Sequence, residues 1–421
     1  MILGIDIGTT TICAVQTADD GAFLHSDTLS GAPMETAHTQ NPDTILAQAQ
    51  SLAAAAPDVR AVAVTGQMHG ILYLDAAGNA VSPLYTWQNE FGNRQRGSET
   101  YAEYVSCLTG YPASSGFGLV THLYLTENGL LPVDAACLCT IGDYVAMKLA
   151  HRSRPLLHAS NAASLGVFDL RRLDFDNEAL SRLSIDRELL PAVTSVLTAY
   201  DGRVFTAIGD NQASFRGSVT NPSRELLINI GTGGQLSCME PAYRAAEHCE
   251  TRPYDGGAYL LVASSLCGGR AYVVLERFFR DILGAFGTEL SDDAVYEGMS
   301  RILAAYMPNA APMVADTTLS GTRENPSLRG EVTGISPDNF TPGGIIDAFL
   351  HGIAAEFLPA YEALCRIRSF SALSLSGNAI RRNPYLRDIF AKTYRLPLSP
   401  HIHTEEAAYG AALLAADYVK L

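Results

Sequence analysis

The feature that most constrains this chain is a short motif that occurs twice. Residues 3–9 read LGIDIGT and residues 226–232 read LLINIGT. An apolar run that ends in Gly-Thr predicts a buried strand followed by a tight turn. The first copy starts the chain and the second lies just past its middle, which favours a duplicated unit over chance recurrence of short Ile/Gly runs. The sequence therefore predicts two related α/β halves.

A connecting segment separates these halves. Residues 217–224 include Thr220-Asn221-Pro222-Ser223, a composition typical of turns and linkers. We therefore expect a first domain over residues 1–217 and a second over residues 222–421. A chain of 421 residues fits two domains, because a domain usually takes about 100–200 residues.

Two proline-containing pairs predict helix starts in the second half. A polar residue followed by proline is typical of the N-cap and first position of a helix. Thr341-Pro342 predicts a helix over residues 345–364, and Asn383-Pro384 predicts one over residues 385–394.

The charge balance limits the kinds of partner. The chain has 29 Lys and Arg against 44 Asp and Glu, giving a net charge of −15, and its basic residues are dispersed. This pattern argues against nucleic acid and anionic lipid as partners. An anionic ligand would then depend on backbone N–H groups, helix N-termini and a metal ion.

Further composition rules indicate the compartment. The eight cysteines form no CxxC pair, so we expect reduced thiols and neither a zinc site nor a disulfide framework. The chain opens directly on an apolar, strand-like run, and no apolar stretch approaches the length of a membrane span. We expect a cytoplasmic protein without membrane contact.

The first turn, Asp6-Ile7-Gly8-Thr9-Thr10, combines the groups that a phosphate and its Mg²⁺ need. A glycine allows close backbone approach, amides and hydroxyls can bind phosphate oxygens, and a carboxylate can bind the metal or its waters. A simple hairpin in which the aspartate caps local amides is the alternative. In the second turn, Gly231-Thr232-Gly233-Gly234, the aspartate is replaced by Asn229, which suits a phosphate loop without a metal.

Together the two turns resemble the phosphate loops of the sugar-kinase, Hsp70 and actin superfamily, and more specifically the FGGY carbohydrate kinases. This resemblance implies an α/β fold of two ribonuclease-H-like (actin-like ATPase) domains with an active-site cleft between them. It implies ATP and Mg²⁺ as cofactors, with Asp6 holding the metal through water. The residues expected to bind the nucleotide phosphates are Gly8, Thr9, Thr10, Gly231, Thr232 and Gly233.

The segment Ile208-Gly209-Asp210-Asn211-Gln212 matches the catalytic segment of these kinases. An aspartate at the cleft can orient an attacking hydroxyl and accept its proton. Taken alone, the segment favours the interpretation of Asp210 as the cap of the following helix. The resemblance implies that Asp210 is the catalytic base of an in-line phosphoryl transfer and that Asn211 helps to hold the sugar.

Two further segments, together with Asn161, resemble the sugar site of the family. Thr65–Gly70 reads TGQMHG, and residues 87–89 read WQN where ketose kinases carry Trp-Asn-Asp or Trp-Gln-Asp. From the residues alone, a histidine beside an apolar neighbour and a single tryptophan are typical of a packed core. The resemblance implies sugar contacts for Gln67, Met68, His69, Trp87, Gln88, Asn89 and Asn161.

Two segments point to a subgroup. Asn161-Ala162-Ala163-Ser164 and Arg252-Pro253-Tyr254-Asp255-Gly256 are closer to sedoheptulokinases than to xylulokinases. The resemblance thus implies phosphorylation of a primary hydroxyl of a ketose, with sedoheptulose as the expected substrate. A xylulokinase or another ketose or polyol kinase is one alternative, and a non-catalytic nucleotide-binding regulatory module is the other. The sequence leaves open whether the protein forms a homodimer.

The expected adenine loop departs from the family pattern. Ser376-Gly377-Asn378-Ala379 stands where the family carries Ser-Gly-Gly-Gly. The resemblance implies nucleotide contacts for Gly377 and Asn378, with Asn383 as a further contact to the base. Side chains in place of glycines could narrow this site and alter nucleotide choice.

Overall fold

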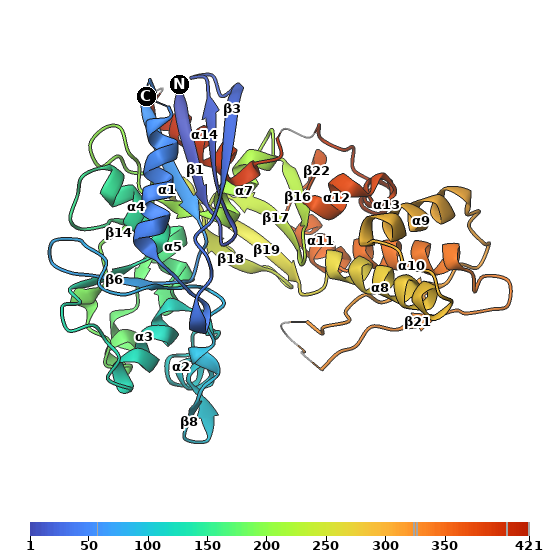
Figure 1. The fold of residues 1–421 in the computed structure, drawn as a ribbon, viewed down its shortest axis with the longest axis horizontal. Coiled ribbons are helices and arrows are strands. Elements are labelled where there is room, and N and C mark those ends of the chain that lie inside the picture. The colour runs from blue at the N-terminus through green and yellow to red at the C-terminus, as the bar shows by residue number, and fades with distance from the viewer. Residues whose placement is uncertain (57, 323–324, 326, 401–402, 420–421) are drawn as a thin grey trace.

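The computed structural model describes residues 1–56, 58–322, 325, 327–400 and 403–419. Its framework is two five-stranded mixed sheets (Figure 1). The first sheet has the strand order β15 (Ile208–Gly209), β5 (Ala61–Gly66), β1 (Ile2–Ile7), β2 (Thr11–Thr17) and β3 (Phe23–Ser30). The second has the order β18 (Glu250–Pro253), β19 (Tyr259–Ser265), β17 (Gly234–Glu240), β16 (Glu225–Ile230) and β22 (Ala372–Ser376).

The two sheets repeat one strand pattern. β1 pairs antiparallel with β2 and parallel with β5, where Asp6 lies opposite Thr65. β16 pairs antiparallel with β17 and parallel with β22, where Asn229 lies opposite Ser376. The two copies of the sequence motif thus form equivalent strands, and the predicted two-domain α/β fold is confirmed.

Helices and short strands surround the sheets. The first half adds α1 (Pro42–Ala54), α2 (Tyr101–Thr109), α3 (Gly118–Glu127), α4 (Ile141–Leu149), α5 (Ala159–Ser164), α6 (Asn177–Arg182) and α7 (Asp210–Ser218). The second adds α8 (Gly269–Ala285), α9 (Asp292–Ala305), α10 (Pro342–Ala355), α11 (Leu358–Cys365), α12 (Asn378–Arg382), α13 (Pro384–Tyr394) and α14 (Glu406–Val419). The paired short strands are β4 (Thr39–Gln40) with β7 (Leu84–Tyr85), β6 (Leu72–Leu74) with β10 (Cys137–Cys139), β8 (Gln95–Arg96) with β9 (Glu99–Thr100), β11 (Leu157–His158) with β14 (Val193–Thr194), β12 (Phe168–Asp169) with β13 (Asp174–Phe175), and β20 (Val314–Ala315) with β21 (Val332–Thr333).

Both predicted helix starts are confirmed. The Thr341 side chain accepts a hydrogen bond from the Gly344 amide at the start of α10, and Asn383 accepts one from the Leu386 amide at the start of α13. The predicted helix over residues 345–364 is wrong in its length, because the chain leaves α10 at Ala355 and begins α11 at Leu358. A proline at position 359 cannot donate a backbone hydrogen bond, so it fits only the first turn of a new helix.

The last helix crosses back to the first half. Red α14 packs against α7 and against the blue strands of the first sheet (Figure 1). A β-carbon at Gly410 would lie 1.8 Å from the Ala213 carbonyl oxygen, so α7 and α14 approach with only glycine between them. One core cluster contains side chains from both sheets and both helices. The domain ranges 1–217 and 222–421 stay predictions, and α14 adds a part of the second range to the core of the first.

Among the described residues, no helix is both long enough and apolar enough to cross a membrane.

Candidate active site

Two aspartates meet at one edge of the first sheet. β15, β5 and β1 run parallel, so their carboxyl ends lie together, and Asp210 directly follows β15 while Asp6 lies near the end of β1. Removal from water raises the pKa of Asp210 to about 6, although a hydrogen bond from the Asn211 amide and the charge of Arg252 limit the rise. Burial raises the pKa of Asp6 to about 7, with smaller contributions from the negative charges of Asp210 and Glu405.

The surroundings of Asp6 fit a shared metal ion better than an all-protein metal cage. Its Oδ1 atom is buried and has no hydrogen-bond partner among the described residues. Across that same part of the chain, no three or more His, Cys, Asp or Glu side chains gather in a metal-binding group. Mg²⁺ commonly takes one or two carboxylates and completes its shell with waters and substrate phosphates. An orphaned carboxylate oxygen beside a second carboxylate meets that requirement.

The first phosphate loop and the expected sugar site are in direct contact. The Trp87 Nε1–H donates a hydrogen bond to Thr9 Oγ1 over 3.1 Å. A hydrogen bond from the Gly8 backbone N–H to the Thr11 carbonyl closes the turn at 3.0 Å. The Thr10 carbonyl accepts a hydrogen bond from the backbone N–H of Gly31, which follows β3. Trp87 remains 46% exposed, so its ring is available as a wall of an open site.

Gln67 and Met68 lie in the same strand-end cluster. The Gln67 backbone N–H donates to the Ile7 carbonyl. The Gln67 side chain donates to the Gln40 side chain, which in turn donates to the Thr9 carbonyl. Met68 lies next to the Gly209–Asp210 turn, because a β-carbon at Gly209 would be only 2.6 Å from the Met68 Sδ atom. Both predicted residues are therefore close to the loops, with Gln67 buried beneath them.

His69 is held in an unusual backbone conformation with φ of 72°. Its main-chain N–H donates to Ser164 Oγ, and its ring Nδ1 lies 2.7 Å from the Ser164 carbonyl oxygen. Because a carbonyl can only accept, Nδ1 carries the proton and Nε2 is the acceptor nitrogen of the neutral ring. The ring stacks on Phe117 at 4.8 Å and 10°. The ring is thus fixed by both Ser164 and Phe117.

Three other predicted sugar residues have less direct positions. Asn89 is 1% exposed and its amide donates to the Ala37 carbonyl. Asn161 is also buried, and its amide donates to Asp143 and to the Ala207 carbonyl. Gln88 is tied through its backbone to Thr86. The structure thus uses the amides of Asn89 and Asn161 within the protein, where they support neighbouring loops.

The second half contacts the residue after Asp210 through two side chains, of which the sequence analysis singled out only Arg252. Asn211 Nδ2 donates to Gln235 Oε1 at 2.7 Å, and Arg252 Nη1 donates to Asn211 Oδ1 at 3.3 Å. Gln235 directly follows the second phosphate loop at the start of β17. These contacts connect the residue after Asp210 to the nucleotide half. No local sequence signal marks Gln235, whereas Arg252 belongs to the RPYDG segment.

A cavity of about 960 Å³ contains most of the expected nucleotide residues of the second half. Gly231, Thr232, Asn378 and Asn383 line it, while Gly233 lies next to them in the loop and Gly377 precedes Asn378 at the start of α12. The side chain of Asn229 donates to Ser376 Oγ and so joins the two loops. Sequence reasoning missed the far wall from α8 and α9, where Tyr272 and Tyr296 stack with their ring centres 5.7 Å apart. The other missed lining residues are Arg270, Val273, Asp293, Glu297, Ser300, Arg301 and Arg382.

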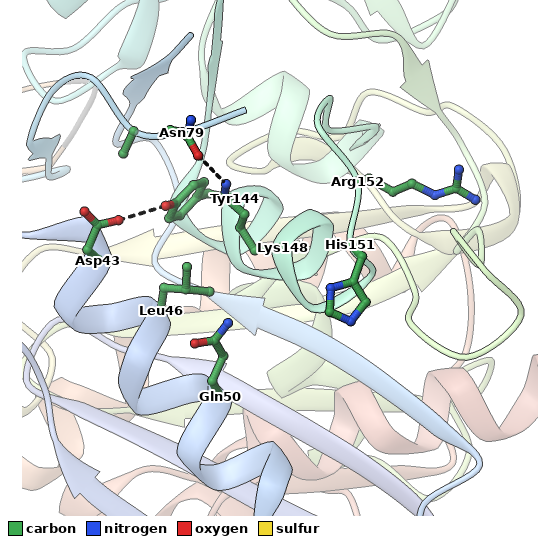
Figure 2. Close-up of a pocket in the computed structure, with 9 residues that line it drawn as sticks. Asp43, Leu46, Gln50, Asn79, Tyr144, Lys148, His151 and Arg152 are labelled. Carbon is green, nitrogen blue, oxygen red and sulfur yellow. Dashed lines mark hydrogen bonds between the residues drawn. The ribbon is translucent and has the colours of Figure 1, made fainter. Parts of the chain in front are cut away.

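A separate cavity of about 540 Å³ lies between α1 and α4. Figure 2 shows Asp43 bound to Tyr144 and Lys148 bound to Asn79 along its wall. None of the predicted site residues lines this cavity. Lys148 lies in the last turn of α4 and Arg152 lies just after it, where positive charge is favoured by the helix dipole.

Paired sheets of one pattern, an acidic edge and a glycine-lined cavity define a two-domain α/β fold of the kind that sugar kinases share. The N-terminal and C-terminal domain models of the FGGY family of carbohydrate kinases match residues 1–204 and 226–417. The chain belongs to this family and is a phosphotransferase that acts on a sugar.

Particular relatives span nearly the whole chain. Mouse (Mus musculus) sedoheptulokinase is 27% identical over 98% of this chain and 96% of its own length. Among solved structures, xylulose kinase from Lactobacillus acidophilus has a TM-score of 0.79 at 19% identity, covering 100% of this chain and 89% of that one. Plasmodium falciparum glycerol kinase with ADP has a TM-score of 0.78 at 18% identity, with the same coverage. At these identities the solved structures show the fold alone.

Proposed function

We propose that this protein transfers the γ-phosphoryl group of ATP to a primary hydroxyl of a ketose, with sedoheptulose as the preferred substrate and Asp210 as the base. The observation that carries the proposal is the placement of Asp210. It opens α7 at the carboxyl edge of the first sheet, directly after Gly209, which lies against Met68, and its neighbour Asn211 is bound by two residues of the second half.

The electrostatics of Asp210 support its role as base. With a pKa of about 6, the carboxylate is ionised at neutral pH yet binds a proton more readily than an ordinary aspartate. A base is most effective when its pKa lies near the working pH. In phosphoryl transfer most of the catalysis comes from positioning and charge stabilisation, so a modest base between two binding surfaces is sufficient.

The nucleotide would lie in the 960 Å³ cavity, with its phosphates pointing to the two glycine loops. Asp6 would hold Mg²⁺ jointly with the phosphates, and the bound ion would neutralise their charge. The ADP carried by the similar glycerol kinase structure and the family's kinase activity support ATP as donor. The open wall formed by Trp87 supports a sugar stacked beside Thr9, since aromatic faces pack well against C–H surfaces.

The preference for sedoheptulose rests on the similarity to mouse sedoheptulokinase across 98% of the chain. The test is coupled ADP release with Mg²⁺-ATP and a panel of sedoheptulose, xylulose, ribulose, fructose, gluconate and glycerol. The highest kcat/KM is expected with sedoheptulose. A clear preference for another member would refute the substrate and retain the kinase, whereas ATP binding without any sugar-dependent ADP release would support the non-catalytic alternative.

Asp210→Asn provides the matched test of the base. A general base contributes about 10²–10⁴-fold to a rate, so the variant should lose at least about 99% of sugar-dependent turnover. Trp87, the only tryptophan of the chain, allows sugar binding to be followed by its fluorescence in the same variant. Binding should persist without turnover, and near-normal turnover would refute the role of Asp210.

A further inference from the structure

The turn that carries Asp210 is held by a serine from another element. Gly209 directly precedes Asp210, and its backbone N–H donates to Ser160 Oγ at 2.9 Å. Ser160 lies in α5 and is 1% exposed. Among the described residues no side chain caps the start of α7, so this bond adds a restraint on the backbone from which the Asp210 side chain projects.

The orientation of Ser160 is in turn fixed by His158. The His158 Nδ1 atom accepts from the Ser160 backbone N–H at 3.2 Å and lies 2.8 Å from Ser160 Oγ. Because the backbone N–H can only donate, Nδ1 is unprotonated, and the Ser160 hydroxyl therefore donates to it. The hydroxyl oxygen is left to accept from Gly209. The neutral imidazole then carries its proton on Nε2.

This Nε2 atom faces a carboxylate of the second half. His158 is fully buried, and its Nε2 lies 3.6 Å from Asp255 Oδ1, with no closer hydrogen-bond partner among the described residues. Asp255 also accepts from the Leu197 amide and from the Tyr418 hydroxyl. Burial acts to raise the pKa of Asp255, but its interactions with His158, Tyr418 and Leu197 outweigh burial and keep the pKa below its ordinary value. A negative charge therefore stands opposite the Nε2 proton.

The segment that supplies Asp255 also holds the residues just after Asp210. Arg252 donates to Asn211, and the Pro253 carbonyl accepts from the Gln212 side chain at 2.8 Å. The RPYDG segment thus contacts both sides of the catalytic residue, directly on the α7 side and through His158 and Ser160 on the β15 side. Its neighbour α5 packs against β18.

We propose that Asp255, His158 and Ser160 form a positioning relay that fixes the Gly209–Asp210 turn and makes its geometry depend on the seating of the second half. The proposal rests on the role of Asp210 given above. The three side chains are positioning residues and not a nucleophilic triad, because the Ser160 hydroxyl is buried and already bonded to Gly209 and His158. The relay gives a use to the RPYDG segment, which has no other assigned role.

The test compares Ser160→Ala with a control that loses the same kind of bond elsewhere. Ser106 Oγ accepts from the Ala113 amide at 3.0 Å, far from the catalytic turn in sequence and fold. Displacement of a reacting group by about 1 Å can cost about 100-fold in rate. Ser160→Ala should therefore lower kcat about 10- to 100-fold with the KM values for ATP and sugar within about threefold of wild type. Ser106→Ala should retain wild-type kcat.

Asp255→Asn tests the other end of the relay while keeping side-chain volume. It should lower kcat by a similar factor, and the double variant with Ser160→Ala should be no slower than the slower single variant, because both interrupt one chain of contacts. A kcat within twofold of wild type in either single variant overturns the relay, as does an equal loss in Ser106→Ala. If Ser160→Ala does not fold, Asp255→Asn decides alone. An inactive wild-type enzyme would instead overturn the proposed function, so the two failures are distinguishable.

Discussion

Replacing Asp210 by asparagine should stabilise the fold, and the gain should depend on pH. In the folded protein the pKa of Asp210 is raised from 3.8 to about 6, so the fold disfavours its ionised form. Because its pKa is raised on folding, protonated Asp210 stabilises the folded state, and this stabilisation is fully present below pH 3.8. The stabilisation is lost as pH rises through about 6. Asparagine has no ionised form and escapes this loss.

The size of the gain follows from the pKa. A rise of about two units corresponds to about 3 kcal/mol at pH 8, since each unit is worth about 1.4 kcal/mol. At pH 5, which lies between the two pKa values, the same linkage predicts a stability gain of about 1.5 kcal/mol. The raised pKa of Asp6 adds to the effect in the same direction, because Asp210 is one of its causes.

The assay is urea unfolding of wild type and Asp210→Asn at pH 5 and pH 8, followed by circular dichroism. Asp134→Asn serves as the control, because Asp134 is an exposed carboxylate outside both sheets and the cleft. Asp210→Asn should have a higher free energy of unfolding than wild type at both pH values. The difference from wild type should be about twice as large at pH 8 as at pH 5. An equal increase at both pH values, or a loss at pH 8, would refute the electrostatic reasoning.

Two further predictions concern the helix contact and the nucleotide cavity. Gly410→Ala should lower the melting temperature by several degrees, because its β-carbon would meet the Ala213 carbonyl at 1.8 Å, whereas Gly284→Ala, in open space on α8, should gain about 0.5–1 kcal/mol. Thermal unfolding of both variants checks this, and equal stability would contradict the packing of α7 on α14. Tyr272→Ala should raise the KM for ATP by up to about tenfold and leave the KM for sugar unchanged, since an aromatic stack is worth about 0.5–1.5 kcal/mol. Initial-rate kinetics test this, and a parallel rise in both KM values would place the nucleotide elsewhere.

The duplicated framework could be predicted because its signal is local. The repeated run around Asp6 and Asn229 carries both the strand and the turn in consecutive residues, so pattern alone identifies two equivalent strands. Capping chemistry is equally local, and the starts of α10 and α13 were predicted correctly. The break at residues 356–357 was missed, because apolar periodicity continues across it while Pro359 ends the hydrogen-bond ladder.

The site was harder to predict because its walls come from distant segments. Tyr272 and Tyr296 complete the nucleotide cavity from two helices, and their pairing depends on how α8 packs on α9. Gln235 meets Asn211 only because the fold brings the start of β17 next to the start of α7. For Asn89 the sugar contact stays a prediction, and the structure adds a hydrogen bond from its amide to the Ala37 carbonyl that the motif did not indicate. Tertiary placement decides such cases.

Because α14 packs on the first sheet, that sheet can be covered only late in the synthesis of the chain. The first half leaves the ribosome long before the helix that covers its sheet exists, because α14 follows α7 by nearly half the chain. At about 5–20 residues per second, the roughly 190 intervening residues take about 10–40 s to synthesise. During this time the faces of β1, β2 and β5 that α14 later covers are exposed in the nascent chain. The first half therefore cannot complete the core that it shares with α14 until that helix has been synthesised.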